Sequence, residues 1–296
     1  MGKTAFLFSG QGAQFPGMMK EYHDSIPAAR RVFDVADASL GRSISDLCFE
    51  GPKEQLDLTH NTQPCVLAAD LAAYEAALAA GFSPDGLAGF SLGEYAALVA
   101  SECLPLSDAF PLVQLRADAM QDAVPVGQGA MAAVMKVGLE DLQAMCDEVD
   151  GYVQPANVNS PAQIVVSGRT EAVEALVALC KSRKVRAMKI PVSVPSHCAL
   201  MTPAADALSE ALAGVSLGEP ALPVYMNVTA APAADASEAS ANMVAQLTSP
   251  VLWRQTLERL WADGFTRFLE CGPGATLSGF VKKTLPEAEI LSLETR

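Results

Sequence analysis

The sequence predicts an α/β protein with a mostly parallel sheet, helices on its faces, and a small inserted βαββαβ subdomain of the ferredoxin-like kind. An apolar run at residues 4–8 leads into a glycine-rich loop, and strand and helix patterns alternate at short spacing in residues 62–100. A βαββαβ order then fits between residues 130 and 190. With 296 residues, half of them apolar, the chain is long enough for one large domain or two.

Charge and composition exclude several classes of function. The chain carries 34 acidic and 20 basic side chains, a net charge of −14, and this balance argues against nucleic acid as the main partner. No apolar run approaches the roughly 20 residues of a membrane span, and residues 4–8 are too short for a signal peptide. We therefore expect a cytoplasmic protein with no membrane partner.

The cysteines and histidines indicate chemistry without a cofactor. The seven cysteines include no C-x-x-C pair, which is typical of reduced thiols in the cytosol. Of the three histidines, only His197 is directly beside a cysteine, and its spacing from Cys198 fits no common zinc site. We expect no metal and no cofactor.

The first half of the chain contains the pattern of a parallel sheet. A buried strand is expected at residues 4–8 and a helix at 62–80, where Pro64 lies in the first turn and Gly81 follows as a stop signal. The pattern then predicts a strand at 86–90, a helix at 92–100 and a helix at 107–122.

The middle of the chain predicts the inserted subdomain. Its expected elements are a strand at 130–136, a helix at 139–149, strands at 152–158 and 163–167, a helix capped by Thr170, and a strand at 185–190. We place this subdomain at residues 126–192, bounded by Pro125 and Pro191, and the larger domain at 1–125 and 193–296. Residues 229–241, rich in Ala, Ser, Pro and Asp, are expected to form a surface loop.

Residues 89–93 form a G-x-S-x-G motif where an expected strand meets an expected helix. Such a motif makes a tight turn that exposes its central serine, here Ser91, above the helix N-terminus. The helix dipole and the backbone N–H of Leu92 would then favour the oxyanion of a tetrahedral intermediate. The alternative is an ordinary turn between a strand and a helix.

A serine nucleophile needs a general base, and His197 is the strongest candidate. His23 and His60 lie in charged or polar stretches, which indicates surface positions. His197 lies in an apolar, proline-stiffened segment, where a polar ring needs a partner. It is either the base for Ser91 or a core histidine with a satisfied hydrogen bond. No Asp or Glu stands out as a carboxylate that would orient it.

Arg116 falls on the apolar face of the helix expected at 107–122. The apolar stripe of that helix includes Leu112, Leu115 and Met120, and Arg116 lies four residues after Leu112. A buried guanidinium needs an anion. The anion is either an Asp or Glu of the protein, in a structural salt bridge, or the carboxylate of a substrate.

Residues 181–189 concentrate positive charge. Five of the twenty basic residues lie there: Lys181, Arg183, Lys184, Arg186 and Lys189. In a chain with a net charge of −14 this concentration is unusual. It is either the solvated C-terminal end of a helix, where cations are favourable, or a docking patch for an acidic partner or for phosphates.

Seven motifs, in this order along the chain, resemble the family of malonyl-CoA:acyl carrier protein transacylases. They are FSGQGAQ at 8–14, TQP at 62–64, GFSLGEY at 89–95, QLR at 114–116, NVNSP at 157–161, VPSHCALM at 194–201 and ECGPG at 270–274. The resemblance spans nearly the whole chain, and seven ordered motifs are far more specific than one G-x-S-x-G match.

The resemblance implies a hydrolase-like α/β domain, with the active site in a gorge between this domain and the ferredoxin-like insert. It implies that Ser91 is the nucleophile, that His197 is its base, and that Arg116 binds the malonyl carboxylate. The backbone N–H groups of Gln11 and Leu92 would form the oxyanion hole.

Two further implications concern the surroundings of the nucleophile. In the family a backbone carbonyl orients the histidine, and the matching segment here begins at Gln246, which would explain why no carboxylate orienter stands out. Many members carry histidine where this chain has Phe90, so its acyl selectivity is expected to differ.

The activity that the resemblance implies is transfer of a malonyl group from coenzyme A to the phosphopantetheine thiol of an acyl carrier protein, through a malonyl-serine. Both fatty-acid and polyketide synthesis use this step. The expected partners are a coenzyme A thioester and the acyl carrier protein, and a monomer is expected. Because carrier proteins are acidic, the basic residues at 181–189 are the candidate docking patch.

Three other functions fit parts of the same pattern. A serine hydrolase or thioesterase would use the same pair, Ser91 and His197. A trans-acting polyketide acyltransferase would differ in acyl selectivity. A non-catalytic relative would keep only the fold, and the presence of both Ser91 and His197 argues against it.

Overall fold

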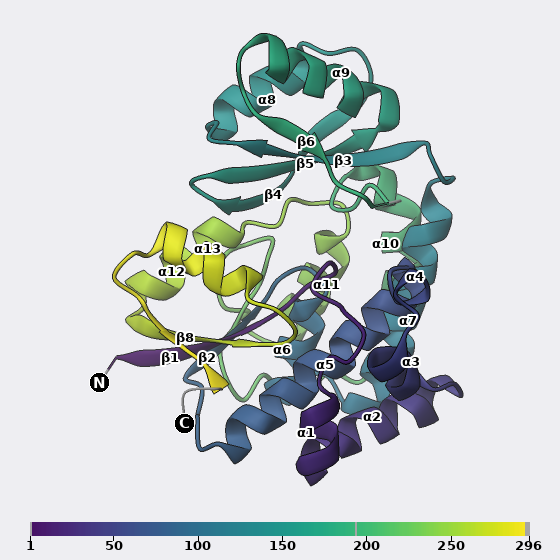
Figure 1. The fold of residues 1–296 in the computed structure, drawn as a ribbon, viewed down its shortest axis with the longest axis vertical. Coiled ribbons are helices and arrows are strands. Elements are labelled where there is room, and N and C mark those ends of the chain that lie inside the picture. The colour runs from purple at the N-terminus through teal and green to yellow at the C-terminus, as the bar shows by residue number, and fades with distance from the viewer. Residues whose placement is uncertain (1, 193, 294–296) are drawn as a thin grey trace.

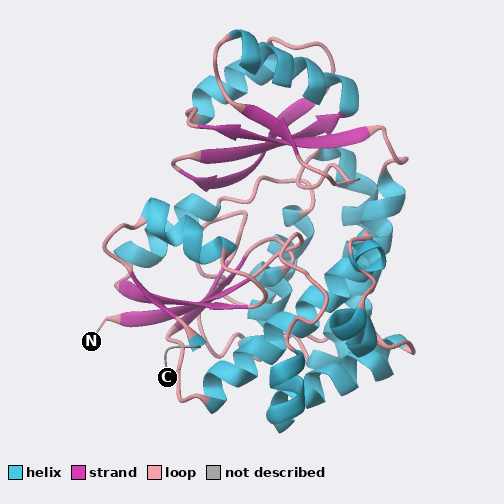
Figure 2. Ribbon diagram, in the orientation of Figure 1, coloured by secondary structure: helices cyan, strands magenta, loops and turns pink. Residues whose placement is uncertain are grey.

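The computed structural model describes residues 2–192 and 194–293, and its strands form two separate sheets (Figure 2). The described strands are β1 (Lys3–Phe8), β2 (Gly86–Gly89), β3 (Gly129–Met135), β4 (Val153–Ser160), β5 (Gln163–Arg169), β6 (Ala187–Lys189), β7 (Val224–Tyr225), β8 (Phe265–Cys271) and β9 (Glu289–Leu291).

Helices pack against both sheets, and most of the first eighty residues are helical. The described helices are α1 (Lys20–Ser25), α2 (Pro27–Leu40), α3 (Ile44–Glu50), α4 (Lys53–Leu56), α5 (Thr59–Ala79), α6 (Gly93–Ala100), α7 (Leu106–Ala123), α8 (Leu139–Asp147), α9 (Thr170–Ser182), α10 (Thr202–Leu212), α11 (Ala236–Gln246), α12 (Trp253–Ala262), α13 (Thr276–Thr284) and the short 3₁₀ turn η1 (Ala199–Met201).

The first sheet is parallel, which confirms the predicted α/β class. Its strand order is β7-β2-β1-β8-β9. In the central strand β1, Phe6 and Phe8 pack into a core with α2, α5 and α7, whereas Ala5 and Leu7 face α12 and α13. A central strand with helices on both sides is buried on both faces, and this explains the continuous apolar run in the sequence.

The second sheet is antiparallel and has the order β4-β5-β3-β6. Helices α8 and α9 cover one of its faces, where Leu142 and Leu176 belong to a separate apolar core. Its other face turns toward the first sheet (Figure 1). The order of elements is the βαββαβ order that the sequence predicts.

The parallel sheet brings two loops together at one edge. Phe8, at the end of β1, is paired with Gly89, at the end of β2. Parallel strands end on the same side of a sheet, so the glycine-rich loop after β1 and the turn after β2 are neighbours. The G-x-S-x-G motif therefore lies beside the loop that contains Gln11.

Helix α5 begins at Thr59, three residues before the predicted start, so Pro64 lies inside it and not in its first turn. A proline leaves the carbonyl four residues before it without a helical partner. Here that carbonyl, of His60, accepts hydrogen bonds from the side chains of Arg42 and Gln114, at 3.1 Å each. The side chains of Arg42, in the loop between α2 and α3, and of Gln114, on α7, thus replace the missing hydrogen bond, which the local sequence pattern did not reveal.

The prediction of a surface loop at 229–241 is wrong for its second half, because α11 begins at Ala236. The start is fixed by reciprocal caps: the Asp235 carboxylate accepts from the N–H of Glu238, and the Glu238 carboxylate accepts from the N–H of Ala234. Thr170 is likewise not the cap of α9. It is the first helical residue, and its hydroxyl donates to the carbonyl of Gly127.

The remaining features concern the first helices, the cysteines and the limits of the described chain. The patterns predict no element at residues 20–56, where α1 to α4 lie. All seven cysteines are free and buried. Among the described helices, none combines the length and apolar character that crossing a bilayer requires. Residues 1, 193 and 294–296, where the predicted domain limits begin or end, lie outside the described residues.

Candidate active site

Ser91 lies on a sharp turn between β2 and α6. It adopts a left-handed backbone with φ of 53°, two residues after the end of β2 and two before the start of α6. The turn is this tight because the flanking glycines have no side chains. A Cβ at Gly89 would lie 1.9 Å from the backbone of Gly93, and one at Gly93 would lie 2.3 Å from the carbonyl oxygen of Phe8. The serine hydroxyl is therefore presented at the tip of the turn.

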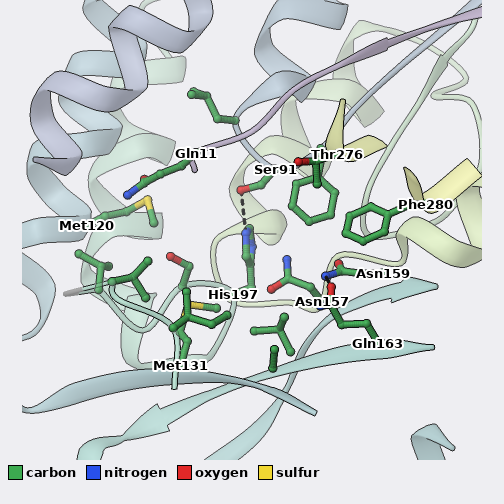
Figure 3. Close-up of a pocket in the computed structure, with 18 of the residues that line it drawn as sticks. Gln11, Ser91, Met120, Met131, Asn157, Asn159, Gln163, His197, Thr276 and Phe280 are labelled. Atoms are coloured by element: carbon green, nitrogen blue, oxygen red, sulfur yellow. Dashed lines mark hydrogen bonds between the residues drawn. The ribbon is translucent and has the colours of Figure 1, made fainter. Parts of the chain in front are cut away.

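His197 contacts this hydroxyl from a distant part of the chain. Its Nε2 lies 2.7 Å from the Oγ of Ser91 (Figure 3), and its Nδ1 lies 2.8 Å from the backbone carbonyl of Gln246. Because a carbonyl only accepts hydrogen bonds, Nδ1 carries the proton and Nε2 is the bare nitrogen. The imidazole is thus oriented to accept the proton of Ser91, without a carboxylate.

The imidazole of His197 is 2% exposed, and burial is the main reason that its pKa is lowered to about 4. The hydrogen bond to Gln246 opposes this shift, and the positive charge of Arg116 adds to it. At neutral pH the ring is therefore uncharged, which is the form that acts as a general base.

Arg116, on α7, is 1% exposed and points at the same hydroxyl. Its Nη1 donates to the Oε1 of Gln63 at 2.6 Å, and its Nη2 donates to the Oε1 of Gln246 at 3.0 Å and to the Oγ of Ser91 at 3.4 Å. These partners are neutral, and in the described part of the chain no carboxylate forms an ion pair with the guanidinium. Among the described residues, Arg116 therefore does not form the structural salt bridge that was one of the two alternatives from the sequence.

Two backbone N–H groups beside Ser91 have no partner among the described residues. They belong to Gln11, in the loop after β1, and to Leu92, which precedes the first turn of α6. Both residues line the same cavity as Ser91. The N–H of Ser91 itself is occupied, because it donates to the side chain of Asn227 at 2.7 Å.

The site opens into a cavity of about 310 Å³ between the two sheets. The first sheet and its helices contribute Phe90, Ser91 and Phe280 to the lining, and the second sheet contributes the side chains that face them (Figure 3): Met131, Asn157, Asn159 and Gln163. The ring of Phe90 packs edge-on against Trp253, with the ring centres 5.4 Å apart. This side of the cavity is consequently apolar.

The basic residues at 181–189 lie on the second sheet and its helix. All five side chains are exposed: Lys181 is in the last turn of α9, Lys189 is on β6, and the other three lie in the connection between them. Arg183 pairs with Glu148, and Lys189 pairs with Glu174 at 2.6 Å. Lys189 is followed directly by Ile190, which lines the cavity, whereas none of the five basic residues is among the described residues that line it.

The other two histidines are not among the described residues that line the cavity. His23 packs against the rings of Phe33 and Phe49, and its side chain is only 22% exposed, so the expected surface position is wrong for it. His60 is half-buried in the first turn of α5, where its carbonyl supports the helix around Pro64.

Sequence reasoning missed the polar side chains behind the serine. Glu94, on α6, and Asn227, after β7, are both fully buried and hydrogen-bonded to the turn or to Gln246. A lone carboxylate in the apolar stretch that follows Ser91 was a usable signal for Glu94. The sequence around Asn227 offers none.

No group of three or more His, Cys, Asp or Glu side chains in the described residues is arranged to hold a metal ion. The chemistry available at this site is that of a serine, a neutral imidazole, a guanidinium and two free N–H groups.

Comparison with known proteins decides the family. The model of the acyl transferase domain matches residues 5–295. The chain belongs to the acyl transferase family.

Curated relatives of this acyl transferase carry one shared name. Two that are called malonyl CoA-acyl carrier protein transacylase are 44% identical over 287 residues, from Bacillus subtilis strain 168, and 42% identical over 289 residues, from Escherichia coli K12. Each alignment covers 96% of this chain, with 90% of the first relative and 93% of the second.

Solved structures agree with this. The transacylase of the same name from Coxiella burnetii superposes with a TM-score of 0.96 at 40% identity, covering 99% of this chain and 94% of that one. A malonyl-transacylase solved in complex with a type II PKS acyl-carrier protein has a TM-score of 0.94 at 39% identity, covering 98% and 95%.

The lowered pKa of His197 predicts how the reactivity of Ser91 depends on pH. If His197 is the base, its active form is the neutral imidazole, which persists at every pH above its pKa of about 4. Labelling of Ser91 by a fluorophosphonate should therefore keep its rate from about pH 8 down to about pH 5, and fall only below that. Circular dichroism at each pH checks that the protein stays folded, and Ser91→Ala gives the background. A midpoint near about 6.5, the ordinary histidine value, would contradict this description of the site.

Proposed function

We propose that this acyl transferase moves a malonyl group from coenzyme A to the phosphopantetheine thiol of an acyl carrier protein, through a malonyl ester of Ser91. The observation that carries the proposal is the buried guanidinium of Arg116, which contacts the nucleophile and has no carboxylate partner among the described residues. A malonyl group supplies that carboxylate. The names of the curated relatives support the same substrate and acceptor.

In the first half-reaction the Oγ of Ser91 attacks the thioester carbonyl while Nε2 of His197 takes its proton. The 2.7 Å contact between these atoms supports this role for His197. The tetrahedral intermediate then collapses, the C–S bond breaks, and the imidazolium returns the proton to the coenzyme A sulfur. Malonyl-Ser91 remains, with His197 neutral again.

The second half-reaction runs the same chemistry in the opposite sense. The carrier-protein thiol gives its proton to His197 and attacks the ester carbonyl. The serine oxygen leaves and recovers the proton from the imidazolium. Because the first product departs before the acceptor binds, the reaction follows a ping-pong order with no cofactor.

The free N–H groups of Gln11 and Leu92 are proposed to hold the negative oxygen of both tetrahedral intermediates. Leu92 lies at the N-terminus of α6, where the helix dipole favours an anion. Donors that are fixed before the reaction stabilise the developing charge without reorganising, and each such donor typically contributes about 3–4 kcal/mol.

Shielding of the ester from water distinguishes a transferase from a thioesterase. The rings of Phe90 and Phe280, with their centres 6.1 Å apart, form an apolar wall of the cavity next to the serine. Such a wall offers water no hydrogen-bonding partner near the ester. It favours transfer over hydrolysis by the same Ser91 and His197.

The architecture proposed for this function has two parts. Residues 1–125 and 193–296 form the hydrolase-like catalytic domain, and 126–192 form the ferredoxin-like subdomain. The antiparallel order β4-β5-β3-β6, with both helices on one face, supports the second assignment. The strained serine turn at the end of a parallel strand supports the first. A monomer in the cytoplasm stays a prediction of the sequence.

The basic residues at 181–189 are proposed as the docking patch for the acidic carrier protein. They are exposed, and they belong to the subdomain whose sheet lines one side of the cavity, with Lys189 next in sequence to Ile190 of the lining. In a chain with a net charge of −14, a local positive surface is what permits two acidic proteins to associate.

Intact-mass measurement after mixing with malonyl-CoA tests the proposed reaction. We expect one malonyl adduct on the native protein, none on Ser91→Ala, and formation slowed by roughly a hundredfold or more in His197→Ala, the usual effect of losing a general base. Added carrier protein in its thiol form should then discharge the adduct and become malonylated.

Two results would overturn this proposal. An adduct that persists in Ser91→Ala would place the reaction elsewhere in the protein. Release of free malonate in place of malonyl-carrier would identify a thioesterase.

Charge reversal tests the docking patch. In Arg183→Glu/Arg186→Glu, transfer from malonyl-Ser91 to the carrier protein should slow by about tenfold at low salt, and the deficit should shrink as salt screens the charges. The matched control reverses two exposed arginines on α12, in Arg254→Glu/Arg259→Glu. Equal rates for the two variants at low salt would exclude the patch as the docking surface.

A further inference from the structure

Glu94 lies behind the nucleophile with a fully buried carboxylate, which makes no hydrogen bond to Ser91 and does not line the cavity; only its backbone N–H donates to the carbonyl of Ser91, at 3.1 Å. One oxygen, Oε2, accepts from the backbone N–H of Asn227 at 2.6 Å, and the other, Oε1, accepts from the side-chain Nε2 of Gln246 at 2.8 Å. Both partners are themselves fully buried. The carboxylate therefore joins a segment that supports the serine to the residue whose carbonyl holds His197.

The side chain of Asn227 holds the backbone of the turn that contains Ser91. Its Oδ1 accepts from the N–H of Ser91 at 2.7 Å, and its Nδ2 donates to the carbonyl of Gly89 at 2.6 Å. One amide group thus bridges both arms of the strained turn. Glu94 fixes this amide in place by holding the backbone N–H of the same residue.

The amide of Gln246 has two chemically different ends: its NH₂ faces two acceptors, and its oxygen faces one donor. Its Nε2 donates to Glu94 and, at 3.0 Å, to the carbonyl of Ser91, while its Oε1 accepts from the Nη2 of Arg116. A carboxylate only accepts and a guanidinium only donates. With a carboxylate at position 94, the amide has one satisfied orientation, with its oxygen toward Arg116.

We propose that Glu94 is a positioning residue that fixes the orientation of the Gln246 amide and thereby holds the guanidinium of Arg116 toward the substrate carboxylate. This inference rests on the proposed function, because the group that Arg116 would bind is the malonyl carboxylate. Glu94 acts through Gln246 and touches no reacting atom.

The charge of Glu94 serves a second purpose in this arrangement. Burial raises the pKa of Glu94 to about 8, whereas the N–H of Asn227, the charge of Arg116 and the amide of Gln246 each lower it. The two donors that meet its two oxygens match the ionised form, since a proton on either oxygen would face an N–H. When Glu94 is ionised, its negative charge balances part of the buried charge of Arg116 without occupying the hydrogen-bonding groups of the guanidinium.

Glu94→Gln tests the proposal with almost no change in shape. The new amide must keep its oxygen toward the N–H of Asn227 and so presents its NH₂ to Gln246. The Gln246 amide can accept a hydrogen bond from this new NH₂ only if it turns over. The NH₂ of Gln246 then faces the guanidinium of Arg116, which is also a donor. We expect the ratio of kcat/KM for malonyl-CoA to that for acetyl-CoA to fall by about tenfold or more, the usual effect of leaving one buried polar group unpaired.

A double variant separates orientation of Arg116 from support of the fold. In Glu94→Gln/Gln246→Glu the new amide donates to the new carboxylate, which now lies directly on Arg116; the hydrogen bond from position 246 to the carbonyl of Ser91 is lost, while that carbonyl keeps the backbone N–H of residue 94 as a donor. Thermal stability should return toward the native value while the malonyl preference stays low, because the guanidinium is already paired. Glu75→Gln, a half-buried carboxylate on α5 away from the cavity, is the matched control and should leave the ratio unchanged.

The outcomes distinguish this inference from the proposed function. If the native protein forms no malonyl adduct, the proposed function fails. If it does, and Glu94→Gln keeps the native preference, Glu94 does not position Arg116. A double variant that regains both stability and preference would show that Glu94 only supports the fold, and would equally overturn the inference.

Discussion

Placing a guanidinium out of contact with solvent costs several kcal/mol unless other groups compensate its charge. In this protein Arg116 is 1% exposed, and its hydrogen-bonding partners in the described chain are amide and hydroxyl oxygens, with a carboxylate only further away at Glu94. This incomplete compensation leaves a site that an anionic acyl group would complete. Burial is the main reason that the pKa of the neighbouring His197 is lowered, and the charge of Arg116 adds to this shift. In the proposed function, the buried charge that would select the substrate therefore also helps to keep the imidazole neutral.

The proposed catalytic pair consists of two residues with strained backbones whose side chains are in contact. Ser91 and His197 both have left-handed backbones, with φ of 53° and 60°, which for residues other than glycine cost free energy and persist only where surrounding structure enforces them. On the serine side, the close contact of Gly89 with Gly93 and the amide of Asn227 enforce the turn. On the histidine side, the carbonyl of Gln246 fixes the ring. The buried network through Glu94 ties both sides together.

Much of this arrangement was accessible from the sequence, and the rest depended on contacts across the fold. The apolar strand at 4–8, the G-x-S-x-G turn and the inward face of α7 all have local signatures, so the α/β class and the burial of Arg116 followed from spacing alone. The pairing of Ser91 with His197 rested on elimination and on family resemblance, because no local pattern relates residues 106 positions apart. Helix α5 began earlier than predicted because Arg42 and Gln114 replace the hydrogen bond that Pro64 removes. The role of Asn227 had no sequence signal, since its amide acts on a turn 136 residues away.

The most direct test of the account is acyl selectivity with and without the guanidinium. Rates of acyl-Ser91 formation from malonyl-CoA, methylmalonyl-CoA and acetyl-CoA would be measured for the native protein and for Arg116→Ala. If the buried charge selects the substrate, the native protein prefers the two acyl groups that carry a carboxylate, and Arg116→Ala loses that preference by about a hundredfold, the effect of removing a buried charged hydrogen bond. An unchanged selectivity profile in a folded Arg116→Ala protein would contradict the account, because Arg116 would then be a structural residue only.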